Sequence, residues 1–100
     1  MDIDQVATIE IDHDGRLHIS PATREFPYIY REAMEVSWDP NKRSLYSPRP
    51  REWGYGRWLQ QILGAAAAQG VKLLVVPGTE WIDVPANIRE ELSEAAAHAA

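Results

Sequence analysis

The sequence predicts an α+β fold: a single domain over residues 1–100, with a mainly antiparallel sheet of four to five strands and two helices packed on one face. Three observations predict it. Two hairpin patterns occupy the first half of the chain, a short apolar strand lies between two helical patterns in the second half, and the length accommodates one hydrophobic core. Hydrophobic residues make up 45% and charged residues 25%, which is ordinary for a globular protein and excludes a disordered tail or a fibre.

The first hairpin is indicated by Ala7, Ile9 and Ile11, which alternate with polar residues as in a strand with one buried face. We expect its loop at residues 13–15, with Gly15 in the left-handed conformation that glycine adopts at little cost. A two-residue loop would mix apolar and polar side chains on one face, so the three-residue loop is favoured. It sets three cross-strand pairs: Ile9 with Ile19, Glu10 with His18, and Ile11 with Leu17.

The second hairpin is indicated by Met34, Val36 and Trp38, which again alternate with polar residues. Residues 39–44 have a strong turn composition, and the turn would pair Trp38 with Leu45. The two prolines that follow the second strand have no amide hydrogen to donate to a ladder, so they end it.

The second half of the chain predicts helix, strand and helix. Apolar residues recur at spacings of three and four between about 54 and 69, with Gly54 placed as the N-cap and Gly70 just past the C-terminus. A last helix is expected from Pro85, which suits the first helical position. The apolar run 71–76 is typical of a strand covered on both faces, so we expect it inside the sheet and not at its rim.

Two shorter segments are less sharply defined by the pattern. Residues 28–32 follow a proline and fit either one helical turn or the start of a strand, and both alternatives stay open. Residues 81–84 are expected to form a short extended piece before the last helix.

The composition restricts the chemistry that is available. The absence of cysteine excludes disulfides, thiolate chemistry and cysteine-type zinc sites, and no serine lies in a nucleophile elbow. The glycines at 54 and 56 lack the third glycine of a dinucleotide site. We therefore expect no catalytic residues, no metal and no cofactor, and an enzyme is the less favoured interpretation.

Charge and hydropathy set expectations about partners and location. The formal net charge of −5 argues against nucleic acid binding, since a contiguous positive face would be hard to build. No apolar stretch is long enough to span a membrane, and the acidic first residues do not form an export signal. The sequence therefore predicts a cytoplasmic protein that does not bind membranes.

Acidic and histidine residues meet at the first turn, where Asp12, His13 and Asp14 are consecutive and Glu10 would face His18. A transition-metal site needs three or four converging ligands, and consecutive turn residues diverge. We interpret the group as an Asp-rich turn beside a surface ion pair.

Aromatic and basic residues are concentrated in the middle of the chain. Six large rings lie between positions 38 and 81, and five of the ten lysines and arginines lie between 42 and 57. Tryptophan beside arginine is the composition of interface hot spots, because both offer a large contact area. We predict a contact surface formed by Tyr46, Arg49, Arg51, Trp53, Tyr55, Trp58 and Trp81.

The same rings could instead fill the core. Trp38 and Trp58 occupy inward positions, and Trp53 fits a hydrophobic staple against Trp58 or Arg57. The sequence leaves open whether the cluster is core alone or a core with a recognition rim.

Three strings and one further tryptophan carry a resemblance to known proteins: Val36-Ser37-Trp38-Asp39, the segment from Leu45 to Tyr55, Trp58, and Thr79-Glu80-Trp81. They resemble small uncharacterised bacterial proteins encoded on the mobile gene cassettes of integrons. The resemblance covers about the middle half of the chain. It implies a short α+β protein, often an oligomer with a candidate binding cleft, and it supplies no catalytic residue.

These observations together predict a non-catalytic binding or interaction protein, an accessory protein of the cassette type. We expect a homodimer that takes a small-molecule or protein partner. Two alternatives stay open. One is a small enzyme with a carboxylate from Asp39, Glu52 or Glu80 in a cleft beside the helix start at 54–56. The other is an antitoxin-like or immunity-like protein whose acidic last helix binds a basic partner.

Overall fold

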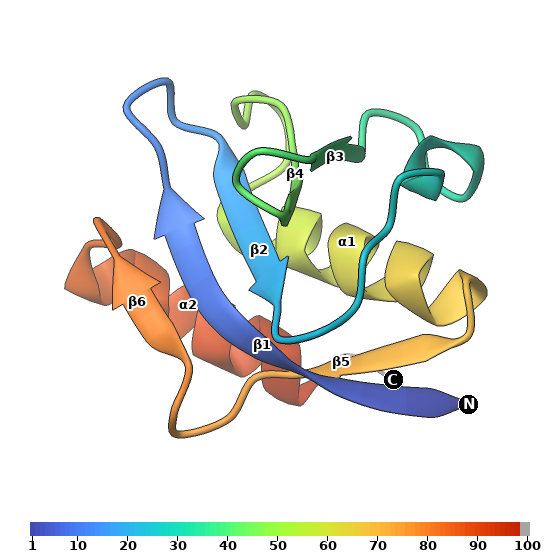
Figure 1. Ribbon diagram of the computed structural model, residues 1–100. Coiled ribbons are helices and arrows are strands. Elements are labelled where there is room, and N and C mark those ends of the chain that lie inside the picture. Colours follow the sequence, from blue (N-terminus) through green and yellow to red (C-terminus); the bar gives the residue numbers. More distant parts are fainter. Residues whose placement is uncertain (99–100) are drawn as a thin grey trace.

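The structure is a computed structural model that describes residues 1–98, and it confirms the α+β prediction (Figure 1). In this part of the chain one curved sheet has six strands, where four to five were expected, and both helices lie on one side of it. Within the same residues, no helix combines the length and the apolar character needed to cross a bilayer. The elements are β1 (Asp2–Ile11), β2 (Leu17–Pro21), a 3-10 turn η1 (Ile29–Arg31), β3 (Ser37–Asp39), β4 (Ser44–Tyr46), α1 (Tyr55–Ala68), β5 (Val71–Leu74), β6 (Glu80–Ile82) and α2 (Ala86–Ala97).

The long strand β1 organises the sheet. On one side it pairs antiparallel with β2, which pairs with β4, and β4 pairs with β3. On its other side β1 pairs in parallel, first with β5 along residues 2–5 and then with β6 along residues 8–10. Each of these short strands therefore covers only part of β1, and the chain between them leaves the ladder.

A β-bulge in β1 changes which of its side chains face the core. The register shifts between Val6 and Thr8. Asp4 and Val6 are buried before the bulge and Ile9 after it, because one extra residue moves the alternation to the other parity. Ala7 is consequently exposed, so its expected place on the buried face is wrong.

Both predicted hairpin registers are confirmed. In the first hairpin Gly15 has φ +84°, and all three predicted cross-strand pairs are formed. In the second, Trp38 pairs with Leu45. Met34, however, is 83% exposed and the strand begins only at Ser37, so its place in the strand pattern is wrong.

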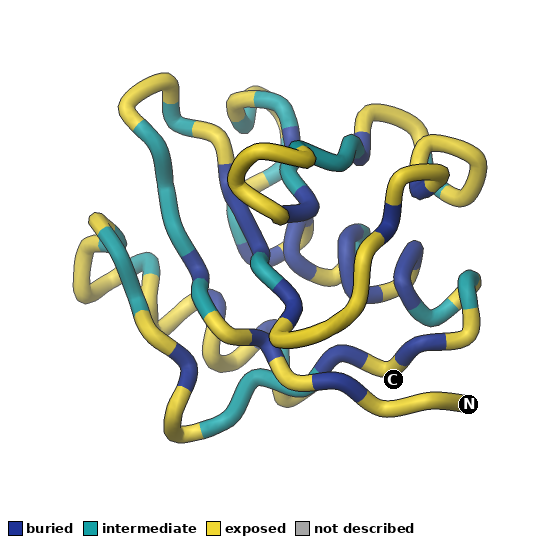
Figure 2. Tube along the Cα trace, viewed as in Figure 1, coloured by how far each residue is buried: buried dark blue, intermediate teal, exposed yellow. Residues whose placement is uncertain are grey.

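The two helices form where the periodicity predicts them. Gly54 is the N-cap of α1, and Gly70 follows its end with φ +85°. Leu59 and Ile62 of α1 are fully buried beneath the sheet, and Leu92 of α2, which packs against α1, closes the core. Figure 2 shows the buried stretches along β2 and the inner side of α1.

The strand β5 lies at the end of the sheet order, so the expectation of an interior strand is wrong. Val71 and Leu73 are buried and β5 contacts α1, while Lys72 between them is exposed. The run continues past the end of the strand as residues 75–76, which are half-buried like Leu74. The apolar run is therefore explained by one covered face and a covered exit from the sheet, not by neighbours on both sides.

The connection between β2 and η1 is fixed by a buried carboxylate. Asp4 accepts hydrogen bonds from the backbone N–H groups of Thr23 (3.0 Å), Arg24 (2.9 Å) and Gln5 (3.0 Å). Burial raises the pKa of Asp4, but these bonds lower it by more, so the pKa lies below its ordinary value. Within residues 28–32, which the sequence left open, Ile29–Arg31 form the 3-10 turn η1, and Ile29 is fully buried.

Candidate functional site

The predicted contact segment, residues 48–55, connects β4 to α1 and is fixed against the first hairpin turn. The Tyr55 hydroxyl donates a hydrogen bond of 2.8 Å to the carbonyl oxygen of Gly15. Arg49 also lies on Gly15, where a Cβ would meet its Cγ at 3.3 Å. Burial raises the pKa of Tyr55. Tyr55 therefore acts as an anchor that holds this segment in place.

Four of the predicted residues line one cavity of about 500 Å³, which we call the arginine–tryptophan cavity. The rings of Trp53 and Trp58 lie 4.8 Å apart, and the Arg57 guanidinium lies 4.2 Å from the Trp53 ring. The predicted staple thus makes both of its expected contacts. The lining residues are Met34, Glu35, Pro48, Arg49, Arg51, Glu52, Trp53, Trp58 and Gln61.

This cavity has charged side chains at its margin and aromatic ones in its wall. Arg51 is 80% exposed and its Nη2 lies 3.9 Å from Oε1 of Glu35, an exposed pair that contributes less than about 1 kcal/mol. Trp58 is 7% exposed and is shared between the cavity and the core. The cluster is therefore core on one side and accessible surface on the other, which joins the two interpretations that the sequence left open.

Tyr46 and Trp81, the other predicted contact residues, lie elsewhere. Tyr46 stacks on His18 at 5.3 Å, with the Arg16 guanidinium 5.9 Å from its ring. Trp81 on β6 lies under Arg89 and lines a second cavity. The structure thus brings together Arg49, Arg51, Trp53 and Trp58, places Tyr55 behind them as an anchor, and separates Tyr46 and Trp81 from them.

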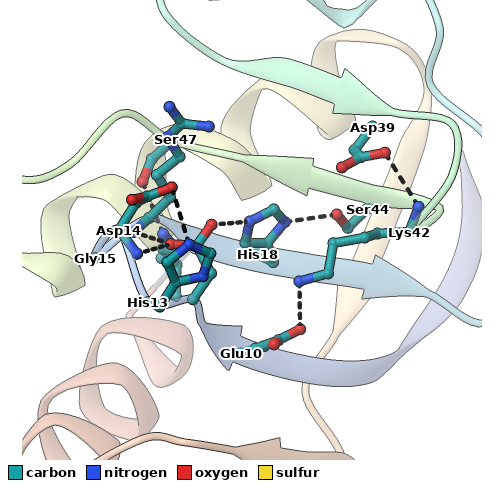
Figure 3. Close-up of polar contacts among 12 residues, drawn as sticks. Glu10, His13, Asp14, Gly15, His18, Asp39, Lys42, Ser44 and Ser47 are labelled. Carbon is teal, nitrogen blue, oxygen red and sulfur yellow. Dashed lines mark hydrogen bonds and ion pairs between the residues drawn. The ribbon is translucent and has the colours of Figure 1, made fainter.

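A buried polar network lies where the sequence indicated a surface ion pair (Figure 3). Glu10 is opposite His18 in the register, as predicted, but Glu10 pairs with Lys42 at 2.9 Å. His18 is 4% exposed and bonds through Nε2 to Asp12 Oδ2 at 2.7 Å and through Nδ1 to Ser44 Oγ at 2.8 Å. The expected surface pair is wrong because β4, which pairs with β2, places Tyr46 and Ser44 against His18, and Asp12 bonds its other ring nitrogen.

Asp12 is the charged member of this network. Its Oδ1 also accepts hydrogen bonds from the backbone N–H groups of Asp14 and Arg16, both at 2.9 Å. Burial raises the pKa of Asp12, but the hydrogen bonds from Arg16 and His18 outweigh it, so the pKa lies below its ordinary value. The carboxylate thus fixes the turn and orients the imidazole at once.

The residue types of this network are those of a hydrolase triad, but the geometry gives them another role. Ser44 has no solvent exposure, so its hydroxyl is placed as a hydrogen-bond partner and not as a nucleophile that a substrate could reach. Among residues 1–98 no three histidine, aspartate or glutamate side chains converge as metal ligands. We therefore describe the network as a polar element of the core.

The glycine pair at the start of α1 accommodates a carboxylate of the chain itself. The Gly56 N–H donates a hydrogen bond of 2.8 Å to Glu91 Oε2, and a Cβ at Gly54 or Gly56 would lie 3.1 Å from that oxygen. Glu91 thus satisfies a helix N-terminus that could otherwise attract an external anion.

The carboxylates named for a cleft beside this helix start are arranged differently. Glu52 and Glu80 are exposed, and Asp39 accepts hydrogen bonds within its own turn from the N–H groups of Asn41 and Lys42. None of the three is buried against the glycines. The specific geometry that motivated the enzyme alternative is therefore not present in the described residues.

The architecture defines the class: a small α+β domain with a mixed, mostly antiparallel sheet and two helices on one side. A cavity lined by arginine and tryptophan lies at the segment that connects β4 to α1. Comparison with known proteins then identifies the family. The family model described as Integron Cassette Protein Hfx_Cass5 matches residues 4–79, and this chain belongs to that family of integron cassette proteins. The resemblance drawn from the sequence is confirmed.

A solved structure of a relative supports this assignment. It is described as an Integron Cassette Protein Hfx_Cass5 from the mobile metagenome of the North West Arm sewage outfall. The two sequences are 59% identical over 97% of this chain and 98% of that chain, with a TM-score of 0.50. A search among curated proteins gives no match.

Proposed function

We propose that this protein works by binding and not by catalysis, and that its ligand or partner docks at the arginine–tryptophan cavity. The observation that carries the proposal is the convergence of two arginines and two tryptophans on one hollow of about 500 Å³. This volume is within the range of small-molecule sites, about 300–1,000 Å³.

The charges around this cavity restrict what it would accept. Arg49 and Arg51 offer donors to an acidic group, while Glu35 and Glu52 in the same lining would repel a polyanion. Trp53 adds a planar face. The cavity therefore favours a ligand, or a segment of a protein partner, with one acidic group next to a planar apolar body.

Indole-3-acetate has this chemistry and serves as the probe. The chain has four tryptophans, so four indole N–H signals report binding in a two-dimensional NMR spectrum. We expect the signals of Trp53 and Trp58 to shift on titration, and the shifts to shrink in Arg51→Ala. The melting temperature should stay unchanged, because Arg51 is 80% exposed and makes only a distant ion pair.

A matched control is Arg31→Ala, because Arg31 at the end of η1 stacks on Tyr28 and is not among the residues that line this cavity. It should leave the titration unaltered. Shifts of similar size at all four tryptophans, or an unchanged titration in Arg51→Ala, would remove the arginine–tryptophan cavity as the docking site.

We extend the proposal to self-association as a homodimer. The exposed Arg51 of one copy and the exposed Glu90 and Glu94 on α2 of another offer opposite charges for such a contact. Light scattering should give twice the 11.3 kDa chain mass at low salt and a falling dimer fraction as salt rises. A monomer mass at every concentration and salt would contradict this.

A further inference from the structure

A second cavity, of about 550 Å³, lies between α2 and the segment that leads from β5 toward β6. It exists because β1 changes its parallel partner from β5 to β6, so residues 75–79 leave the ladder. Hydrogen bonds hold this segment: the Thr79 hydroxyl donates to the Val6 carbonyl at 2.7 Å and accepts from the Val76 N–H at 3.0 Å. The wall of the cavity is therefore fixed by the fold. We call it the Arg89 cavity.

The walls of the Arg89 cavity are mainly aliphatic. Leu73 and Val75 line it from the strand side and Leu63 from α1. The facing positions of the helices carry short side chains, Ala67 and Ala96, which leave the space open. Aliphatic walls of this kind gain free energy by burying an alkyl chain.

The charged residues of this cavity are all of one sign. Arg89 and Lys72 line it, and none of its described lining residues is acidic, although the chain carries 15 acidic and 10 basic residues. Neither cation forms an ion pair with another residue of the described part of the chain. The Arg89 guanidinium lies 4.9 Å from the Trp81 ring centroid, which orients it at the cavity while its N–H donors stay available.

We propose that the Arg89 cavity is a binding site for a small alkyl carboxylate, in which Arg89 pairs with the carboxylate and the aliphatic walls take the chain. This site is separate from the arginine–tryptophan cavity, whose walls are aromatic and whose margin carries carboxylates as well as arginines. A neutral alkyl chain would leave the guanidinium unpaired, and a polyanion would find no partner for its further charges beyond these two cations.

Octanoate and the neutral 1-octanol are the probes, and isothermal titration calorimetry is the measurement. We expect octanoate to bind the wild-type protein more tightly than 1-octanol does. In Arg89→Met, which keeps an apolar stem over Trp81, the Kd for octanoate should rise about tenfold and that for 1-octanol by less than about twofold.

Two further variants complete the test. Arg31→Met removes another arginine stacked on an aromatic ring, at 4.8 Å from Tyr28, and should leave octanoate binding unchanged. Ala96→Leu fills part of the cavity and should weaken both probes, which gives an independent readout if Arg89→Met loses its fold. Circular dichroism melts verify that each variant is folded.

The proposal is overturned if octanoate does not bind, if Arg89→Met binds it as tightly as the wild-type protein, or if Ala96→Leu has no effect. Loss of binding in Arg51→Ala instead of Arg89→Met would place octanoate in the arginine–tryptophan cavity. Because the two cavities use different arginines, failure here leaves the proposed function standing, and the reverse is also true.

Discussion

Replacing His18 should destabilise the fold strongly, because its imidazole is buried and both ring nitrogens are hydrogen-bonded. In His18→Leu, the buried hydroxyl of Ser44 loses its 2.8 Å partner, and leaving such a group unpaired costs about 1–3 kcal/mol. Asp12 loses the 2.7 Å bond to Nε2 but keeps two backbone donors, which adds about 1 kcal/mol. We therefore expect the free energy of unfolding to fall by about 2–4 kcal/mol.

A double-mutant cycle separates this network from simple loss of packing. Ser44→Ala alone leaves the His18 Nδ1 without its partner, so it should also be destabilising. In the double variant neither group is orphaned, so the cost of the pair should be smaller than the sum of the single costs by at least about 1 kcal/mol.

The measurement is urea unfolding followed by tryptophan fluorescence, which the four tryptophans make sensitive. His13→Leu is the control, because this neighbouring histidine is 93% exposed, and its free energy of unfolding should change by less than about 0.5 kcal/mol. Additive single costs, within about 0.5 kcal/mol, would refute the argument that His18 and Ser44 act as one buried pair.

Three further predictions concern stability. Because the pKa of Asp4 is lowered in the folded state, its contribution to the free energy of unfolding is present above the ordinary pKa of 3.8 and is lost as the pH falls through the folded pKa. Acid titration followed by circular dichroism should therefore show a smaller stability loss below about pH 5 in Asp4→Asn than in the wild type. Equal losses would contradict this. Glu91→Gln removes the carboxylate at the start of α1 and should cost about 1 kcal/mol in urea unfolding, whereas its exposed neighbour in Glu90→Gln should cost almost nothing. Gly15→Ala, at φ +84°, should destabilise the fold by about 1–2 kcal/mol. Gly64→Ala, inside α1 with open space around it, should stabilise it by about 0.5–1 kcal/mol. The melting temperatures of the two variants should therefore shift in opposite directions.

Local chemistry explains which parts of the fold could be predicted from the sequence. The loop at Gly15 and the turn at 39–44 fix the two hairpin registers within a few residues, so alternation and turn composition were sufficient. The same holds for α1, whose glycine flanks and apolar stripe are contiguous in sequence.

Features that depend on distant pairing could not be predicted in this way. The rim position of β5 follows from its pairing with β1, about 70 residues earlier, and nothing in its own apolar run encodes that choice. The bulge at Val6 and the buried state of His18 likewise depend on which strands flank β1 and β2. The alternation within one hairpin predicts an outward His18, but Tyr46 and Ser44 of the neighbouring strand β4 bury it.

The candidate site shows the same division. Arg49, Arg51, Trp53 and Trp58 lie within ten residues of one another, and one connection brings them to one cavity, so their proximity was predictable. Trp81 was grouped with them by composition alone. Its strand β6 reaches β1 from the far edge of the sheet, which places it in the other cavity.

The pairing scheme of β1 has a consequence for how the chain is made. This strand leaves the ribosome well before β5 and β6, which complete its parallel edge and emerge only after α1. Until β5 has been synthesised, the backbone N–H and C=O groups of residues 2–5 in β1 stay unpaired and solvent-exposed, next to the exposed Ile3. Nascent chains on neighbouring ribosomes thus expose the same unpaired strand edge to one another. We expect the fraction of chains that mispair to depend on how quickly residues 71–82, which form β5 and β6, are synthesised.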